Sequence, residues 1–331
     1  MIHLTNKQHC TVILTQIGAG VVSVLVPDKN GVLKDIVLGY SNEEDYYNDG
    51  PCSGKIPGRY AGRIGNACFE IDGNKYPLDP NKGIHHLHGG SKGFANQKWN
   101  IEYSDAQKVI FSLKSPDGDQ GYPGEMIVQA EYNWSDDNIL SLDIRAKSDK
   151  DTVVNLTNHT YWNLKGEDSG SILDHSLQIF AQKWLPTDSD LIPTGEIAPV
   201  EQTPMDFRKA KEIGKDIHTD FEALKIGKGY DNCWVLDGGR ELRKGVILSH
   251  QESGISLEVW TNQVATVVYT GNWLSGSPIS KSGRSYNDYD GVAIECQNFP
   301  DAPNKKNFPN TILRAGEEYI ERIEFRIKTL R

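Results

Sequence analysis

Two residues of this sequence combine an acid–base side chain with surroundings that would bury it. His159 lies in the stretch VVNLTNHTYWNL, residues 153–164, whose β-branched and aromatic residues favour a half-buried strand. Glu295 follows the apolar run GVAI, where an ionised carboxylate is costly unless it is paired or takes part in chemistry. Imidazole and carboxylate groups commonly serve as general acid and general base. The alternative for both is a structural role, with hydrogen bonds to asparagine side chains or to the backbone.

A second group of titratable residues is the histidine cluster in NKGIHHLHGG. His85, His86 and His88 lie within four residues. On a strand His86 and His88 would share one face, because side chains alternate with a period of two. That spacing permits a cupin-like metal site completed by a distant ligand such as His159 or Glu295. No carboxylate follows at short spacing, so we expect no metal and a loop in which one histidine is functional.

Further polar residues stand among glycines or at the ends of apolar runs. Arg59 and Arg63 are interspersed with glycines, which indicates tight turns or close approach of the backbone to a ligand. A phosphate-binding loop is excluded because no Gly-Lys-Ser/Thr follows. Asp231 comes two residues before the apolar CWVL, and Gln263 lies between two apolar runs. These residues are candidates to bind a polar ligand.

The elements that must position these residues are short strands. Turn residues separate β-branched and aromatic runs about every 8–12 residues, which is typical of a sandwich or barrel. Residues 208–217 are the best helical candidate, yet they contain a glycine and several lysines. We therefore predict an all-β protein. The expected strands include residues 11–17, 21–26, 32–38, 99–103, 109–113, 126–134, 139–146, 152–157, 177–180, 232–236, 245–249, 255–261, 266–269, 292–296 and 319–327, with hairpins around residues 28–31 and 72–74.

Composition restricts the possible partners. The chain has 331 residues, 37% of them hydrophobic, and no linker-like shift in composition, so we expect one domain over residues 1–331. A dispersed net charge of −10 argues against nucleic acid, which would require a basic stripe. The chain shows neither a signal-peptide pattern nor an apolar run of about 20 residues, so we expect no membrane association. Five scattered cysteines without a CxxC pair indicate reduced thiols and a cytoplasmic location.

Five motifs in order over residues 18–318 resemble the aldose 1-epimerase (galactose mutarotase) family. They are LHGG at 87–90, NHTYWNL at 158–164, YDN at 230–232, TGNWLSG at 270–276, and Glu295 with the following QNFPDAPN. The resemblance implies a large antiparallel β-sandwich, the galactose mutarotase-like supersandwich, with an open cleft for a free sugar and no metal or cofactor. The chain departs from the family at Gly62, where asparagine is usual, and at Val264, where proline is common.

By the same resemblance, Glu295 matches the catalytic base and His159 the catalytic acid. His88, Arg63, Asp231 and Gln263 match positions that contact the sugar, and Tyr161 is a further candidate. The implied reaction interconverts the α and β anomers of galactose and glucose by opening and closing the ring, and it needs a small-molecule monosaccharide as its only partner. Gly62 bears on sugar preference more than on chemistry.

Other functions of the same fold stay open at this point. A non-catalytic sugar-binding protein would bind hexose without accelerating anomer exchange. A sugar-phosphate epimerase would need basic residues at the rim of the cleft, for which Arg59, Arg63 and Lys55 are the candidates. The oligomeric state, monomer or homodimer, cannot be derived from the sequence.

Overall fold

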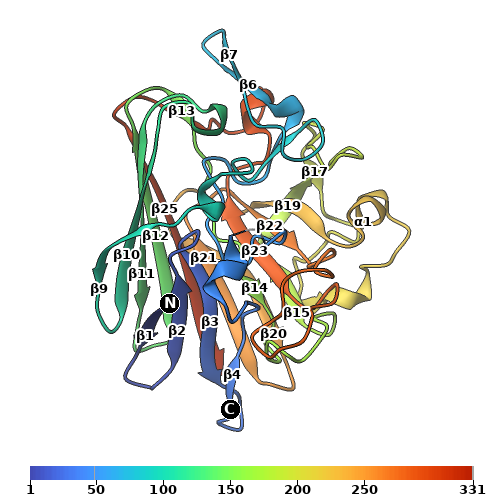
Figure 1. Ribbon diagram of the computed structural model, residues 1–331. Helices are drawn as coiled ribbons and strands as arrows, with labels where there is room; N and C mark the ends of the chain where they lie inside the picture. The colour runs from blue at the N-terminus through green and yellow to red at the C-terminus, as the bar shows by residue number, and fades with distance from the viewer. Residues whose placement is uncertain (48, 330–331) are drawn as a thin grey trace.

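The strands assemble into two large antiparallel sheets that enclose the main core. A computed structural model describes residues 1–47 and 49–329, and Figure 1 shows the arrangement of its elements. The nine-stranded sheet sweeps from β9 at the left edge of Figure 1 to β15 at the lower right. Its order is β18 (Lys211–Glu212), β15 (Ser176–Ile179), β20 (Arg243–His250), β21 (Ile255–Thr261), β25 (Glu318–Thr329), β12 (Ile139–Ser148), β11 (Met126–Trp134), β10 (Lys108–Ser115) and β9 (Asn100–Ser104).

The six-stranded sheet carries most of the candidate site residues. Its order is β14 (Tyr161–Trp162), β23 (Val292–Gln297), β22 (Ala265–Tyr269), β19 (Asp231–Leu236), β16 (Ala181–Leu185) and β17 (Ala198–Pro199). Ile294 and Cys296 of β23 belong to the main core, together with Trp234, Leu257 and Phe325. Alternation along a strand sends Glu295 to the opposite face. One face of this sheet is therefore core, and the other is available for a site.

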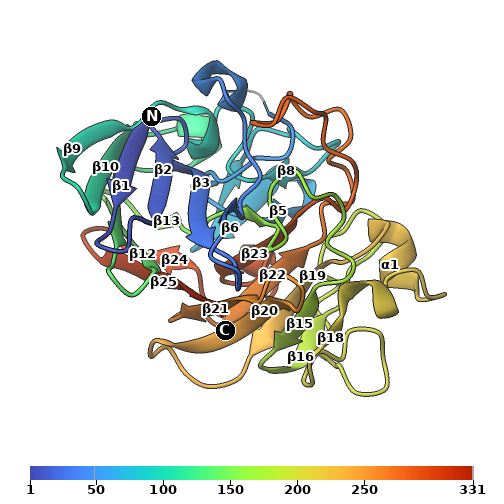
Figure 2. The ribbon, with the colours of Figure 1, turned by 90° about the horizontal axis from the view of Figure 1, so that it is seen from below.

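Smaller elements complete the molecule (Figures 1 and 2). A four-stranded sheet is formed by β1 (Ile2–Thr5), β2 (Thr11–Thr15), β3 (Gly20–Pro27) and β4 (Leu33–Asp35), and the two-stranded sheets are β13 (Thr152–Val153) with β24 (Ile312–Leu313), β5 (Arg63–Ile64) with β8 (His86–Leu87), and β6 (Cys68–Ile71) with β7 (Asn74–Pro77). The 3₁₀ turns are Glu43–Tyr46, Gly65–Ala67, Phe94–Asn96, Asp119–Gly121, Ile213–Lys215 and Ala302–Asn304.

The all-β prediction is confirmed, and the helix prediction was misplaced. Residues 208–217 form β18 and a 3₁₀ turn, whereas the one α-helix among the described residues is α1 (Glu222–Gly227). No helix in residues 1–47 or 49–329 is long and apolar enough to cross a membrane. All five cysteines are free.

The stretch 153–164 is buried, but it is not a continuous strand. In it, Asn155 forms a single parallel bridge with Tyr60, and only β13 and β14 are strands. Between them asparagine side chains satisfy backbone groups that a ladder would otherwise satisfy. Asn155 Nδ2 donates to the carbonyl of Ala61 at 3.0 Å, and Asn158 Nδ2 donates to that of Gly54 at 2.8 Å. The asparagines thus hold an irregular segment in the interior, with His159 in its middle.

Candidate active site

A cavity of about 430 Å³ lies over the free face of the six-stranded sheet. That volume falls in the range typical of small-molecule sites. Its lining includes six of the seven residues predicted for the site: Arg63, His88, His159, Tyr161, Asp231 and Glu295. These residues come from β5, the loop after β8, the 153–164 stretch, β19 and β23, so the fold gathers positions up to 232 residues apart.

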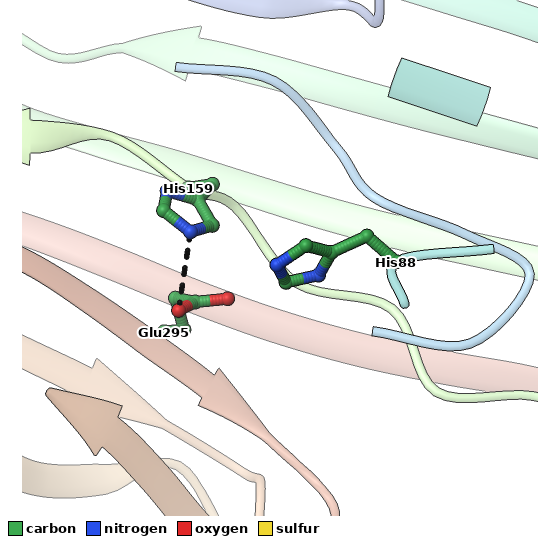
Figure 3. Close-up of side chains that lie close together, drawn as sticks. All are labelled: His88, His159 and Glu295. Atoms are coloured by element: carbon green, nitrogen blue, oxygen red, sulfur yellow. Dashed lines mark ion pairs between the residues drawn. The ribbon is translucent and has the colours of Figure 1, made fainter. Parts of the chain in front are cut away.

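Glu295 and His159 are in direct contact (Figure 3). Nε2 of His159 lies 3.4 Å from Oε1 of Glu295, and both side chains are almost fully buried. Burial, with a smaller contribution from the charge of Lys55, lowers the pKa of His159 to about 4. Burial also raises the pKa of Glu295 well above its ordinary value, helped by Asp231 and opposed by Arg63. Both shifts favour a pair that holds a single proton between the two residues.

The backbone of His159 is held on both sides by one segment. Its N–H donates to the carbonyl of Lys55 at 2.9 Å, and its carbonyl accepts from the N–H of Gly54 at 2.9 Å. The Tyr161 hydroxyl donates to the carbonyl of Pro51, which itself lines the cavity. Nδ1 of His159 is buried and has no hydrogen-bond partner among the described residues. The segment 49–55 therefore fixes the position of the imidazole without occupying its second nitrogen.

His88 faces His159 with its ring set as a hydrogen-bond donor. The two rings meet edge to face, with centroids 5.4 Å apart (Figure 3). Nδ1 of His88 accepts the N–H of Gly62 at 3.2 Å, so a neutral ring carries its proton on Nε2. Burial lowers the pKa of His88 well below its ordinary value, which favours that neutral form. An N–H aimed at the cavity suits a sugar oxygen.

The metal alternative does not fit this arrangement. His88, His159 and Glu295 have donor atoms within 4.8 Å of one another, the separation that a shared ion would need. A metal-bound histidine usually donates its other N–H to an acceptor, whereas Nδ1 of His88 receives a backbone N–H. The HxH pair of that alternative does not form either, because the ring of His86 contacts Asp79 O at 2.7 Å and the Tyr122 hydroxyl at 2.7 Å.

Arg63 and Asp231 are neighbours in the lining of the cavity. Their side chains are partly exposed, and Nη2 of Arg63 lies 3.6 Å from Oδ2 of Asp231. The other proposed basic residues lie elsewhere. Arg59 is buried and donates to Ser115 and to nearby carbonyls, and Lys55 is buried in an ion pair with Asp49. Two of the three cations expected for a phosphate are therefore absent from the cavity lining, whose arginine and lysine residues are Arg63 and Lys82.

Gln263 does not reach the cavity, which corrects its predicted role. It lies in the turn between β21 and β22, where Nε2 donates to the Tyr319 hydroxyl at 3.2 Å. The glutamine that lines the cavity is Gln297, at the end of β23. Alternation supplied a signal for it, since Gln297 lies two residues after Glu295. The residue of β22 that pairs with Glu295 and lines the cavity is Val267.

Aromatic residues form part of the mouth. Trp273 lines the cavity with 54% of its surface exposed, and Lys228 Nζ lies 3.6 Å from the centroid of its ring. Its backbone N–H donates to the hydroxyl of Tyr269, a second lining aromatic, at 3.0 Å. Both residues belong to the region around the TGNWLSG motif, but sequence alone did not indicate which aromatics face the ligand.

The comparisons with known proteins agree with this geometry. The family model for aldose 1-epimerase matches residues 1–326. The chain belongs to the aldose 1-epimerase family. Galactose mutarotase from Homo sapiens is 41% identical over 302 residues, covering 91% of this chain and 86% of that protein. Aldose 1-epimerase from Escherichia coli K12 is 37% identical over 330 residues, covering 98% and 94%.

Solved structures of relatives have the same fold. The GalM/aldose epimerase homologue from C. elegans superposes with a TM-score of 0.91 at 31% identity, covering 100% of this chain and 99% of that chain. Galactose 1-epimerase from Lactobacillus acidophilus gives a TM-score of 0.87 at 28% identity, covering 99% and 94%. The galactose mutarotase-like sandwich expected of an aldose 1-epimerase is thus confirmed.

Proposed function

We propose that this protein is an aldose 1-epimerase that interconverts the α and β anomers of galactose, and of glucose, by opening and closing the sugar ring. The observation that carries the proposal is the buried contact of 3.4 Å between His159 and Glu295 inside the cavity. Family membership and the names of the relatives support the reaction and the galactose substrate.

Ring opening needs one proton removed from the C1 hydroxyl and one delivered to the ring oxygen. We assign the first role to Glu295 and the second to His159. A protonated glutamic acid beside neutral imidazole, and a carboxylate beside imidazolium, carry the same number of protons. The pair can therefore reach its reactive form by moving one proton over a short distance, without exchange with solvent. On closure from the other face of C1 the two transfers reverse, so the pair ends as it began.

The remaining polar residues orient the sugar. His88 donates through Nε2–H, Arg63 provides a fixed positive donor near developing oxygen charge, and Asp231 accepts from hydroxyl groups. Tyr161 packs beside His159 with ring centroids 5.0 Å apart, and we infer that it shapes the pocket around the imidazole. None of these steps calls for a cofactor.

Polarimetry tests the proposed function. Freshly dissolved α-D-galactose and α-D-glucose are followed with and without the protein, after treatment with chelator. We expect both sugars to equilibrate faster than in buffer. Equal rates with and without the protein, together with sugar binding detected by calorimetry, would instead indicate a non-catalytic binding protein.

A further inference from the structure

We propose that Gln297 is a further sugar-contacting residue and that its amide helps to determine which hexoses bind. This inference rests on the proposed function, because it assigns a hydroxyl of the same sugar to a residue outside the predicted set. Gln297 is the first residue of the QNFPDAPN motif, but that motif alone assigns it no role. Its assignment depends on the position that β23 gives the side chain and on the lack of hydrogen-bond partners for its amide among the described residues.

The position of Gln297 follows from the pleat of β23. Ile294 and Cys296 point into the main core, so Glu295 and Gln297 project from the other face. Both line the cavity. Two residues along a strand span about 7 Å, so the backbone positions of Glu295 and Gln297 are about one sugar ring apart.

The amide of Gln297 is buried without a partner. The residue is 0% exposed, and neither Oε1 nor Nε2 has a hydrogen-bond partner among the described residues. Buried polar groups are nearly always satisfied, because an unmade hydrogen bond costs the full desolvation of the group. The other buried glutamine, Gln263, leaves only Oε1 without a partner among the described residues, because its Nε2 donates to the Tyr319 hydroxyl. A donor and an acceptor left open at a cavity wall point to a ligand that supplies both.

Gly62 lies against this amide on the side of β5. A Cβ atom at position 62 would lie 3.3 Å from Nε2 of Gln297 and 3.2 Å from the ring of Pro300. The backbone there has φ +78°, which also favours glycine. A side chain at this position would press on the amide, so the glycine allows β5 to pack this close to Gln297.

A hydroxyl group is the ligand that matches an amide. It donates one hydrogen bond to Oε1 and accepts one from Nε2, and hexoses present several such groups. The C1 hydroxyl is assigned to Glu295, so Gln297 would contact another hydroxyl of the ring. Because galactose and its epimers differ only in hydroxyl orientation, this contact would distinguish between them.

The test measures sugar binding by calorimetry for the wild type and for Gln297→Met, with galactose and its 2-, 3-, 4- and 6-deoxy analogues. We expect the variant to bind galactose roughly 3- to 10-fold more weakly, the effect of one hydrogen bond. One deoxy analogue should bind both proteins equally, because the hydroxyl that Gln297 contacts is already missing. Equal weakening for every analogue would overturn the proposal. Calorimetry reports binding even if anomer exchange is absent, so failure of the proposed function is seen separately.

Gln263→Met is the matched control. It removes a buried glutamine outside the cavity, so any effect on binding should be the same for all five sugars. Thermal unfolding without sugar gives a second readout: Gln297→Met should be at least as stable as the wild type, because it loses no hydrogen bond within the protein, whereas Gln263→Met should be less stable. A lower Tm for Gln297→Met alone would show that the amide supports the fold. Gln297→Asn, which withdraws the amide by one methylene group, should show the same selective loss if the methionine variant fails to fold.

Discussion

At the scale of single residues, opposite pKa shifts act on the two groups in contact. Burial raises the pKa of Glu295 and lowers that of His159 to about 4. The pair therefore gains a second proton only in acid, and it keeps its single proton to a pH well above the ordinary 4.5 of a glutamate. Because the proposed cycle uses the singly protonated pair, activity should fall both at the acidic pH where the pair gains a second proton and at the alkaline pH where it loses its only one.

The first prediction is a bell-shaped pH profile of kcat for mutarotation. The acidic limb should fall near pH 4, where His159 gains a proton while Glu295 still holds one. The alkaline limb should fall where the pair loses its shared proton. Because the two groups interact, both apparent pKa values describe the pair and not either residue alone. Polarimetry with α-D-galactose over a pH series, corrected for the buffer rate, measures the profile. A rate that stays constant from pH 3 to pH 10 would contradict the shared-proton account.

At the scale of elements, the segment 49–55 connects the interior to the site. Lys55 and Asp49 form a fully buried ion pair, and Lys55 Nζ also donates to Asn96 Oδ1 at 3.2 Å. The backbone of the same segment holds His159 through Gly54 and Lys55. Neither residue of this ion pair lines the cavity, yet the pair anchors the segment that holds the backbone of His159.

The second prediction concerns removal of this cation. Lys55→Met leaves the Asp49 carboxylate buried without its partner, which should lower the free energy of unfolding by about 3–5 kcal/mol. Urea denaturation measures the change. Lys7→Met breaks an exposed ion pair with Asp136 and should leave the denaturation midpoint where it is in the wild type. Equal effects of the two substitutions would show that the buried pair has no special role.

Elements with regular alternation were predictable from sequence, and irregular ones were not. Residues 126–134 and 255–261 were predicted with the bounds of β11 and β21, because one face of each strand is buried. The stretch around His159 was expected to be a strand, yet asparagine side chains replace its ladder. The helix was misplaced because α1 has only six residues and little amphipathic pattern. Alternation along β23 gave a signal for Gln297, two residues after Glu295, whereas the position of Gln263 outside the cavity lining depends on tertiary contacts.

At the scale of the whole molecule, several histidines are kept neutral by burial. His175 lies outside the cavity, where Nε2 accepts the N–H of Leu164 at 2.9 Å and Nδ1 lies 3.1 Å from Asp174. Its ring stacks on His250 with centroids 4.8 Å apart. Burial lowers the pKa of His175 from 6.5 to about 4, against the effect of Asp174. The unfolded chain therefore binds a proton at this residue in a pH range where the folded chain does not.

The third prediction follows from that difference in proton binding. Stability contributed by neutral His175 is complete above pH 6.5 and is lost as the pH falls toward 4. At pH 5 the loss from this residue should be about 2 kcal/mol, since each pKa unit corresponds to about 1.4 kcal/mol. Urea denaturation at pH 7.5 and pH 5 should show a smaller decrease for His175→Gln than for the wild type. The same decrease in both proteins would contradict the assignment.

We also propose that residues 1–331 form one domain, since the main core draws residues from both large sheets and from the four-stranded sheet. A single cooperative transition in the denaturation curves just described would agree with this proposal. The cavity over the six-stranded sheet contains the His159–Glu295 pair to which we assign the acid–base chemistry.

The most direct measurement of the central claim is the rate of α-D-galactose mutarotation by Glu295→Gln, compared with the wild type. The substitution keeps the shape of the side chain but removes the proton acceptor, so kcat should fall by about 10²- to 10⁴-fold. Calorimetry should still detect galactose binding, and circular dichroism should show an unchanged fold. A variant that binds galactose and accelerates mutarotation as fast as the wild type would contradict the role of Glu295 as the base.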